Sequence, residues 1–221
     1  APEVHIQFEQ KFGVRIIETM GLTETSSPIL SNPLPPGLIK YGSPGIAWGN
    51  EVRIVDKQLK PLNANEEGEI AVRGTNVMKG YFKNPDATSD ALVNGWLLTG
   101  DLGIMDEEGY VFVKGRTKEL IIKGGENIAP REIDEALYEH PDVVDAAAFA
   151  VEEPHYGQEV EACVSLVSGS SCSSNELREF CRPRLGEFKT PRKIHIMEDL
   201  PKGPSGKIQR LRLAEMTQDL S

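Results

Sequence analysis

Four short strings in the chain combine glycine with the charged and hydroxyl side chains that bind phosphates, sugars and metal ions. They are Met20-Gly-Leu-Thr-Glu24, Trp96-Leu-Leu-Thr-Gly-Asp101, Gly115-Arg-Thr-Lys-Glu-Leu-Ile-Ile-Lys-Gly-Gly-Glu-Asn-Ile128 and Leu200-Pro-Lys-Gly-Pro-Ser-Gly-Lys207. The carboxylate of Asp101 has two acceptor oxygens, which suit the two neighbouring hydroxyls of a ribose. Thr23 and Glu24 place a hydroxyl beside a carboxylate on a glycine-containing loop. These residue types indicate nucleotide chemistry.

The common nucleotide-binding motifs do not fit these strings. The glycines of Gly203-Pro-Ser-Gly206-Lys207 are separated by two residues, whereas those of a P-loop are separated by four. Ile208 follows where Mg²⁺ ligation needs Ser or Thr. The segment Lys123-Gly-Gly-Glu-Asn127 lacks the G-x-G-x-x-G spacing of a dinucleotide-binding turn. A nucleotide site in this chain must therefore be of another type.

The composition is that of a globular, acidic protein. The chain has 221 residues, 39% of them hydrophobic, and a formal net charge of −10. This charge argues against a broad contact with phosphate backbones, so we expect no nucleic-acid partner. No run approaches the roughly 20 apolar residues that a membrane helix needs, so we expect no membrane span.

The cysteines and histidines predict no further site. Cys163, Cys172 and Cys181 form an odd set without C-x-x-C pairing, and the first and last read as small core residues. We therefore expect a reducing compartment, the cytoplasm. The four histidines show no metal-ligand spacing, and we assign them no role.

Periodicity in the first half predicts mainly strands. We expect a helix over 3–12 that ends at Gly13, a short strand over 14–17 and a long irregular connection over 28–49. Further strands are expected at 51–55, 69–73, 102–105 and 110–114. The acidic turn 106–109 is expected to be a solvated loop. Residues 1–117 are thus interpreted as the strand-rich tail of a larger domain that begins upstream.

The second half alternates helices and strands. Helices are expected at 130–140 and 208–216, and strands near 144–151, 159–166 and 193–197. Ser173 and Glu176 form a capping box that begins another helix. The side chains expected to face inward from that helix are those of Leu177, Phe180, Cys181 and Leu185. Residues 118–221 therefore predict a small domain of their own, and the fold class is α+β.

The four strings, in this order, resemble those of the adenylate-forming enzyme superfamily, which includes acyl-CoA and aryl-CoA synthetases, peptide-synthetase adenylation domains and luciferases. The resemblance extends over almost the whole chain, and it implies that a family member starts well upstream of Ala1. In this family, the Asp of the T-G-D string and the Arg of the G-R-x-K string bind the ribose of ATP. The matching residues are Asp101 and Arg116. A turn residue that binds nearby amides is the alternative role for Asp101.

The resemblance assigns the first string to the rest of the nucleotide. Glu18 matches the acceptor of the adenine amino group, and Met20 stands where the family usually has an aromatic residue stacked on adenine. Gly21 matches part of the ATP/AMP-binding segment, and Thr23 matches the residue that contacts the reacting α-phosphate. Glu24 matches a ligand of Mg²⁺, a cation that takes one or two carboxylates plus phosphate oxygens. A polar helix cap is the alternative role for this loop.

The resemblance assigns the last two strings to catalysis and to CoA. Lys207 matches the lysine whose ammonium offsets the repulsion between a carboxylate and the α-phosphate. Lys118 matches the hinge about which the small mobile C-terminal domain pivots between two poses. Gly124, Gly125 and Glu126 match the segment that lines the path of the CoA thiol, where a missing side chain leaves room. The pair Gly124-Gly125 is equally suited to a hairpin turn.

The resemblance implies an AMP-forming carboxylate–CoA ligase, an acyl-CoA synthetase of the kind found in fatty acid metabolism. Its substrates would be ATP with Mg²⁺, a small-molecule carboxylic acid and CoA, with no prosthetic group. An adenylation domain that loads a carrier protein and a non-catalytic nucleotide-binding fragment are the alternatives. We expect the 221 residues alone to be inactive. Acylation of Lys207 by a modifying enzyme would remove its charge and regulate the reaction.

Overall fold

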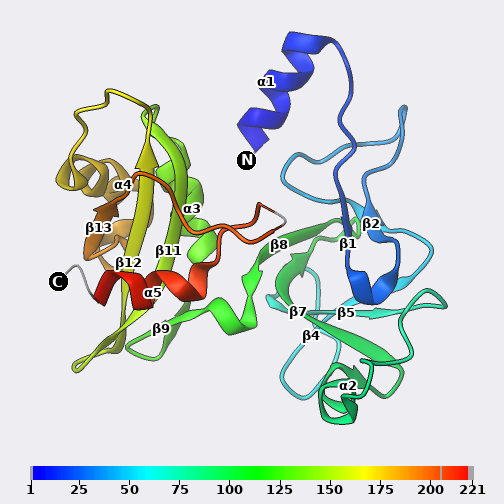
Figure 1. Cartoon of the computed structure of the whole chain (residues 1–221). Coiled ribbons are helices and arrows are strands. Elements are labelled where there is room, and N and C mark those ends of the chain that lie inside the picture. Colours follow the sequence, from blue (N-terminus) through cyan, green and yellow to red (C-terminus); the bar gives the residue numbers. More distant parts are fainter. Residues whose placement is uncertain (1, 205, 219–221) are drawn as a thin grey trace. The chain divides into compact units, whose positions relative to one another are not determined.

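The structure is a computed structural model that describes residues 2–204 and 206–218 (Figure 1). The chain divides into two compact units, with the boundary between Thr117 and Lys118. The model has an α+β architecture, as predicted: helices accompany three separate sheets. Among the described residues, every helix is too short or too polar to cross a membrane.

The first unit is built largely from antiparallel strands. Its elements are α1 (Pro2–Phe12), β1 (Thr19–Gly21), η1 (Thr23–Thr25), β2 (Pro28–Ser31), β3 (Ile46–Ala47), β4 (Glu51–Val55), β5 (Gly68–Arg73), α2 (Pro85–Ala91), β6 (Leu92–Val93), β7 (Trp96–Met105) and β8 (Val111–Arg116). One sheet has the order β1-β2-β3, and the other has the order β4-β5-β7-β6 with β8 also paired to β7. A shared core of Ile29, Leu30, Ile54, Ile70, Val72 and Val111 packs the two sheets together.

The second unit has three layers (Figure 1). Its elements are η2 (Thr117–Glu119, which crosses the boundary), β9 (Ile121–Lys123), β10 (Glu126–Ile128), α3 (Pro130–Tyr138), β11 (Val143–Glu153), β12 (Gly157–Leu166), α4 (Ser174–Lys189), β13 (Lys193–Ile196) and α5 (Arg210–Gln218). The sheet has the order β10-β9-β12-β11, with β13 parallel to β12. The helices α3 and α4 cover one face over the larger core, and α5 covers the other through Leu213 and Phe149.

The predicted strand over 14–17 is wrong. The structure has irregular backbone there, and the first strand begins at Thr19. Side chains of α1 take the place of a partner strand: Glu9 Oε1 accepts the amide of Ile16 at 2.9 Å, and His5 Nε2 lies 3.1 Å from the Ile16 carbonyl. Because these backbone groups already have partners, the segment needs no ladder.

The connection over 28–49 is less irregular than predicted, because it contains β2 and β3. The acidic turn at 106–109 is a loop in which Glu107 and Glu108 are exposed, as predicted. Asp106 and Glu108 both bind the ammonium of Lys40, and Asp106 lies 2.5 Å from it. The helix α2 and the short strands β1 and β6 were not predicted, and β9 and β10 were implied only by the hairpin alternative for Gly124-Gly125. They are short enough that hydrophobic periodicity gives little signal.

The helix α4 begins as predicted. Ser173 Oγ accepts the amide of Glu176, and the Glu176 carboxylate accepts the amide of Ser173, which completes the capping box. Leu177, Cys181 and Leu185 are buried, as expected. Phe180 was expected to face inward, but it is 42% exposed and contacts His140 edge-to-face at 4.9 Å. The buried residues repeat every four positions, and Phe180 lies at the edge of that stripe.

Candidate functional site

Asp101 and Arg116 meet on neighbouring strands. They are register partners on β7 and β8, and Arg116 Nε lies 2.8 Å from Asp101 Oδ1. The Asp101 side chain is 9% exposed, whereas that of Arg116 is 56% exposed. A buried carboxylate is thus neutralised by a guanidinium that still reaches solvent. Both groups keep hydrogen-bonding capacity for a polyhydroxyl ligand.

The backbone around Asp101 is held by side chains from β5, from β7 itself and from η2. Gly100 has φ +73°, a conformation that glycine adopts without strain. Its amide donates to Glu69 Oε1 at 2.8 Å, and its carbonyl accepts from Thr117 Oγ1 at 2.7 Å. Among the described residues, no backbone amide donates to the Asp101 carboxylate. The amide of Asp101 itself donates to Thr99 Oγ1. This segment of β7 is therefore fixed by Glu69, Thr99 and Thr117, which sequence reasoning missed.

Thr23 and Glu24 lie on η1, directly after β1. The turn is fixed by the buried Thr25, whose hydroxyl accepts the Leu22 amide at 3.1 Å. Thr23 remains exposed, and Glu24 is half-buried. The polar-cap alternative fits Thr25, and it leaves the side chains of Thr23 and Glu24 available to a ligand.

A tyrosine orients the carboxylate that the resemblance assigns to Mg²⁺. Tyr81 donates its hydroxyl to Glu24 Oε1 at 2.9 Å, and Met78 donates its amide to the Glu24 carbonyl at 2.7 Å. Burial and the hydrogen bond to Glu24 raise the pKa of Tyr81, so the hydroxyl stays a donor. A single oriented carboxylate suits Mg²⁺ that is held mainly by phosphate oxygens. Tyr81 is a further residue in contact with a candidate site residue that the sequence did not reveal.

Gly21 is required by space. A Cβ there would lie 2.9 Å from the Ser27 carbonyl oxygen and 3.0 Å from Pro28 Cα, closer than real Cβ contacts. Because both neighbours are backbone atoms, any larger residue would displace the loop that follows β1. The glycine therefore keeps η1 close to the start of β2.

Glu18 has protein partners within the first unit. Its Oε2 lies 3.2 Å from Nδ1 of the buried His5 and accepts the Gly42 amide at 3.3 Å. His5 thus contacts a candidate site residue, although no role was predicted for it. The Met20 side chain is half-buried against the core of the first unit. Glu18 therefore lies just before β1, and Thr23 and Glu24 lie just after it. Asp101 is paired with Arg116.

Lys118 is exposed in η2, beside a buried charge cluster of the second unit. Arg210 Nε lies 3.1 Å from Glu119, and its Nη2 lies 2.6 Å from Asp134 Oδ2. Arg210 also donates to the Ala148 carbonyl. One guanidinium thereby connects the segment after Lys118, helix α3, strand β11 and the start of α5.

Lys207 lies on a loop that its own backbone closes. Gly203 donates its amide to the Lys207 carbonyl at 2.8 Å, and Gln209 donates to the Pro201 carbonyl at 2.7 Å. Lys202 and Ile208 form a β-bridge, and the Lys207 side chain is exposed. Because Arg210 anchors the chain three residues later, the loop holds Lys207 at the surface of the second unit.

Gly124 and Gly125 form the two-residue turn between β9 and β10. Lys123 and Glu126 are paired across the turn, and the glycines have φ +57° and +86°. Positive φ at both positions is the requirement of a type I′ hairpin turn, so the hairpin alternative is confirmed. A Cβ on Gly125 would meet nothing within 4 Å. The space beside the turn is therefore open.

A polar pocket with two aromatic rings lies next to this turn, and sequence reasoning did not reveal it. A Cβ on Gly124 would approach Tyr156 to 3.3 Å and Phe188 to 4.0 Å. The pocket is lined by Lys123, Tyr156, Glu159, Arg178, Glu187, Phe188, Thr190 and Arg192. Two of these charges, the buried Lys123 and Glu159, are paired at 2.6 Å. In the sequence, the Gly124-Gly125 pair pointed to this place in the fold, but Tyr156 and Phe188 come from segments far along the chain.

His140, Asp142 and Cys172 come together at the loops before β11 and α4, with ligand-type atoms within 4.8 Å of one another. The sequence showed no ligand spacing because Cys172 is distant in the chain. His140 Nδ1 accepts the amide of Asp142 at 3.2 Å, which places the ring proton on Nε2. That nitrogen faces Cys172 Sγ at 3.8 Å. In this tautomer the His140 ring presents an N–H rather than a lone pair to Cys172.

The sequence matches two family models. The AMP-binding enzyme model matches residues 1–82, and the AMP-binding enzyme C-terminal domain model matches residues 132–207. The two matches fall on either side of the boundary between the structural units. The chain therefore belongs to the AMP-binding, adenylate-forming enzyme family, as the four strings predicted.

Similar proteins include acid–CoA ligases. The chain is 51% identical to sulfoacetate–CoA ligase of Cupriavidus necator, over 96% of this chain and 42% of the relative. It is 40% identical to oxalate–CoA ligase of Arabidopsis thaliana, over 97% of this chain and 42% of the relative. The crystal structure of ATP-bound MatB from Rhodopseudomonas palustris matches with a TM-score of 0.92 and 34% identity, over 99% of this chain and 44% of that one. The chain thus spans about two fifths of the length of the curated relatives it matches.

Proposed function

We propose that this chain is part of an AMP-forming carboxylate–CoA ligase, which converts ATP, a carboxylic acid and CoA into acyl-CoA, AMP and pyrophosphate. The observation that carries the proposal is the buried Asp101 carboxylate paired with the exposed Arg116. Two curated relatives, 51% and 40% identical to this chain, are named sulfoacetate–CoA ligase and oxalate–CoA ligase. The remaining candidate residues supply the groups that the two half-reactions need.

In the first half-reaction, a carboxylate oxygen of the acid attacks the α-phosphorus of ATP, and the bond to pyrophosphate breaks. Asp101 and Arg116 would hold the ribose, and Glu18 would accept from the adenine amino group. Thr23 would donate to the α-phosphate. Both reactants are anions, so positioned positive charge lowers the barrier most. The exposed ammonium of Lys207 would supply that charge.

Mg²⁺ fits the donor set at η1. Glu24 offers a carboxylate that Tyr81 orients at 2.9 Å, and the neighbouring Thr23 is free to bind phosphate. A bound Mg²⁺ would neutralise charge on the phosphate oxygens. Tyr81 would keep the Glu24 carboxylate in one rotamer, so that metal binding costs less side-chain entropy.

In the second half-reaction, the CoA sulfur attacks the acyl carbon, the thiol proton is released, and the carbon–oxygen bond to AMP breaks. The open turn at Gly124-Gly125 would let the thin thiol arm pass. The adjacent pocket offers the Tyr156 and Phe188 rings for a base and the Arg178 and Arg192 guanidiniums for phosphates. A pivot at Lys118 would exchange the Lys207 loop for this turn at the reacting centre.

Lys207 and Gly125 should separate the two half-reactions in the full-length protein. Lys207→Ala should slow acid-dependent pyrophosphate exchange by about 10²–10³-fold, the scale of losing one transition-state charge stabiliser. It should spare CoA transfer from preformed acyl-adenylate. Gly125→Leu should do the reverse. Equal slowing of both half-reactions by each variant would contradict the two-pose mechanism.

Each variant has a matched control. Lys202→Ala removes an ammonium from the same loop, where it binds Asp145 and Asp199 instead, and should leave exchange nearly unchanged. Gly109→Leu imposes the same strain as Gly125→Leu, because Gly109 has φ +85° and an equally open surrounding, but it lies in the other unit. The acid panel should include sulfoacetate and oxalate, which the relatives' names specify. Acylation of the exposed Lys207 should act like the Ala change, because it removes the charge.

A further inference from the structure

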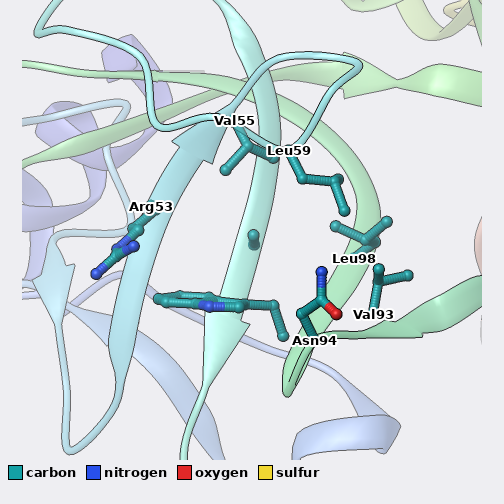
Figure 2. Close-up of a pocket in the computed structure, with 8 residues that line it drawn as sticks. Arg53, Val55, Leu59, Val93, Asn94 and Leu98 are labelled. Atoms are coloured by element: carbon teal, nitrogen blue, oxygen red, sulfur yellow. The ribbon is translucent and has the colours of Figure 1, made fainter.

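A small pocket opens on the first unit at the outer face of the sheet β4-β5-β7-β6 (Figure 2). The opposite face of this sheet packs Ile54, Ile70 and Val72 into the core. The pocket has a volume of about 160 Å³. Its lining consists of Arg53, Val55, Leu59, Ala71, Val93, Asn94, Trp96 and Leu98. It shares no residue with the candidate nucleotide or CoA sites.

The hollow arises from side-chain size across three paired strands. Arg53, Ala71 and Leu98 are register neighbours on β4, β5 and β7. The side chain of the central Ala71 is a single methyl group between two long side chains, so it leaves an unfilled space above β5. Figure 2 shows Leu59, Leu98 and Val93 gathered on one side of the pocket and Arg53 on the other. Apart from Asn94, which lies beside Val93, the walls are thus apolar, and the charge lies at one end.

Leu59 reaches the pocket at a conformational cost. Its φ is +62°, which is unusual for a residue with a bulky side chain. The turn that imposes this value is held by Asp56, whose Oδ1 accepts the amides of Gln58 and Lys60 at 2.8 and 2.9 Å. A strained residue that persists under such constraint is typical of ligand sites.

The charge at the pocket is a guanidinium with unused donors. Arg53 stacks on the Trp96 ring at 4.5 Å, and the nearest carboxylate, Glu51, is 3.9 Å away. Both oxygens of Glu51 are already bound to Arg73, at 2.9 and 2.6 Å. These three charged groups sum to a local positive charge in a chain whose net charge is −10. The Arg53 side chain is 45% exposed, so an anion can reach it.

We propose that this pocket binds a short-chain monocarboxylate, with its carboxylate on Arg53 and its alkyl tail against Val55, Ala71 and Leu98. The volume is close to the roughly 150 Å³ of an apolar cavity that binds benzene, which suits a chain of about four to six carbons. Such a pocket is mostly apolar with one placed charge, the usual construction of a small-molecule site. The site would sense a free acid independently of the ligase proposal.

Trp96 is a built-in reporter for this site. The chain contains two tryptophans, and Trp48→Phe leaves Trp96 as the only one. Titration of that variant with hexanoate should change the Trp96 fluorescence with a saturable curve. Hexan-1-ol, which has the tail without the charge, should bind at least tenfold more weakly. A curve that does not saturate, or equal affinity for the alcohol, would overturn the proposal.

Substitutions in the Trp48→Phe background locate the site. Arg53→Gln should weaken hexanoate binding at least tenfold, the effect of losing a hydrogen bond to a charged group. Ala71→Leu should fill the hollow and abolish the response, with its fold checked by circular dichroism. Arg131→Gln, an exposed arginine on α3 of the other unit, is the matched control and should bind as before. Unchanged affinity of Arg53→Gln, which lies on the surface and should fold regardless, would refute the site.

The same ligand must bind when the rest of the polypeptide is present. Saturation-transfer NMR on the full-length protein should show contact of the hexanoate methylenes, and Arg53→Gln should weaken that signal; an unchanged signal in Arg53→Gln would overturn the proposal. Loss of the signal in the full-length protein alone would show that another segment occupies the pocket, which would overturn the proposal.

Discussion

At the scale of single residues, the chemistry depends on where charges are buried. Asp101→Ala should lower kcat/KM for ATP at least tenfold in the full-length protein, because about 1.5–3 kcal/mol is lost per hydrogen bond to a charged group. Asp101→Asn keeps the shape of the side chain but not its charge, so its kcat/KM should lie between those of the unchanged protein and of Asp101→Ala. Asp90→Ala removes an exposed carboxylate on α2 and is the control. Steady-state kinetics at varied ATP measure the effect, and an unchanged kcat/KM would make Asp101 a turn residue only.

The three thiols should react at different rates. Burial raises the pKa of Cys163 to about 12 and that of Cys181 to about 11. Because the thiolate is the reactive form, both should resist iodoacetamide at pH 8 in the folded chain. Cys172 also has a raised pKa, from partial burial and then from Glu176 and Asp142, but it is partly exposed. We expect Cys172 to be alkylated first, and faster as the pH rises.

Mass spectrometry of peptides after timed alkylation checks this order. The urea-unfolded chain is the control, since all three thiols should then react alike. Alkylation of Cys163 as fast as Cys172 in the folded chain would show that β12 opens readily. Both buried thiols lie in apolar clusters of the second unit, so they are core residues, as the sequence indicated.

At the scale of elements, Arg210 holds the second unit together. Its side chain is 16% exposed and binds Asp134 on α3, Glu119 on η2 and the β11 backbone. Arg210→Ala should lower the free energy of unfolding by about 3–5 kcal/mol, the scale of leaving a buried charge unpaired. Arg212→Ala, two residues on and exposed, is the control and should cost little. Urea unfolding followed by circular dichroism measures both.

A double change tests the physical reason. Arg210→Met with Asp134→Leu removes both charges and should recover part of the lost stability, because no unpaired charge remains. Equal stability of Arg210→Ala and Arg212→Ala would show that the cluster contributes nothing. The cluster also explains how a loop that ends in Lys207 is held near the segment after Lys118 within one unit.

At the scale of the whole molecule, the two units have separate cores. The second unit buries its own apolar cluster between α3, α4 and the sheet. We therefore expect residues 118–221 to fold alone, with a single cooperative urea transition. Circular dichroism and near-ultraviolet signals should report the same midpoint. A broad, non-cooperative transition would show that this unit needs the remainder of the polypeptide.

Local interactions made part of this protein predictable from its sequence. The capping box of α4 involves residues three apart, and the hairpin turn at Gly124-Gly125 needs only two glycines. The four strings predicted the family, because the residue types that the reaction needs occur in a set order along the chain. Hydrophobic periodicity indicated the long strands β11 and β12, since each repeats over many residues.

The tertiary structure decided what depends on distant partners. The segment 14–17 is not a strand because α1 supplies its hydrogen bonds. Arg210 meets Glu119 and Asp134 across 91 and 76 residues of sequence. The pocket of the first unit that Trp96 lines forms because β4, β5 and β7 align Arg53, Ala71 and Leu98. Such contacts arise from burial and strand register, and no pattern of neighbouring residues encodes them.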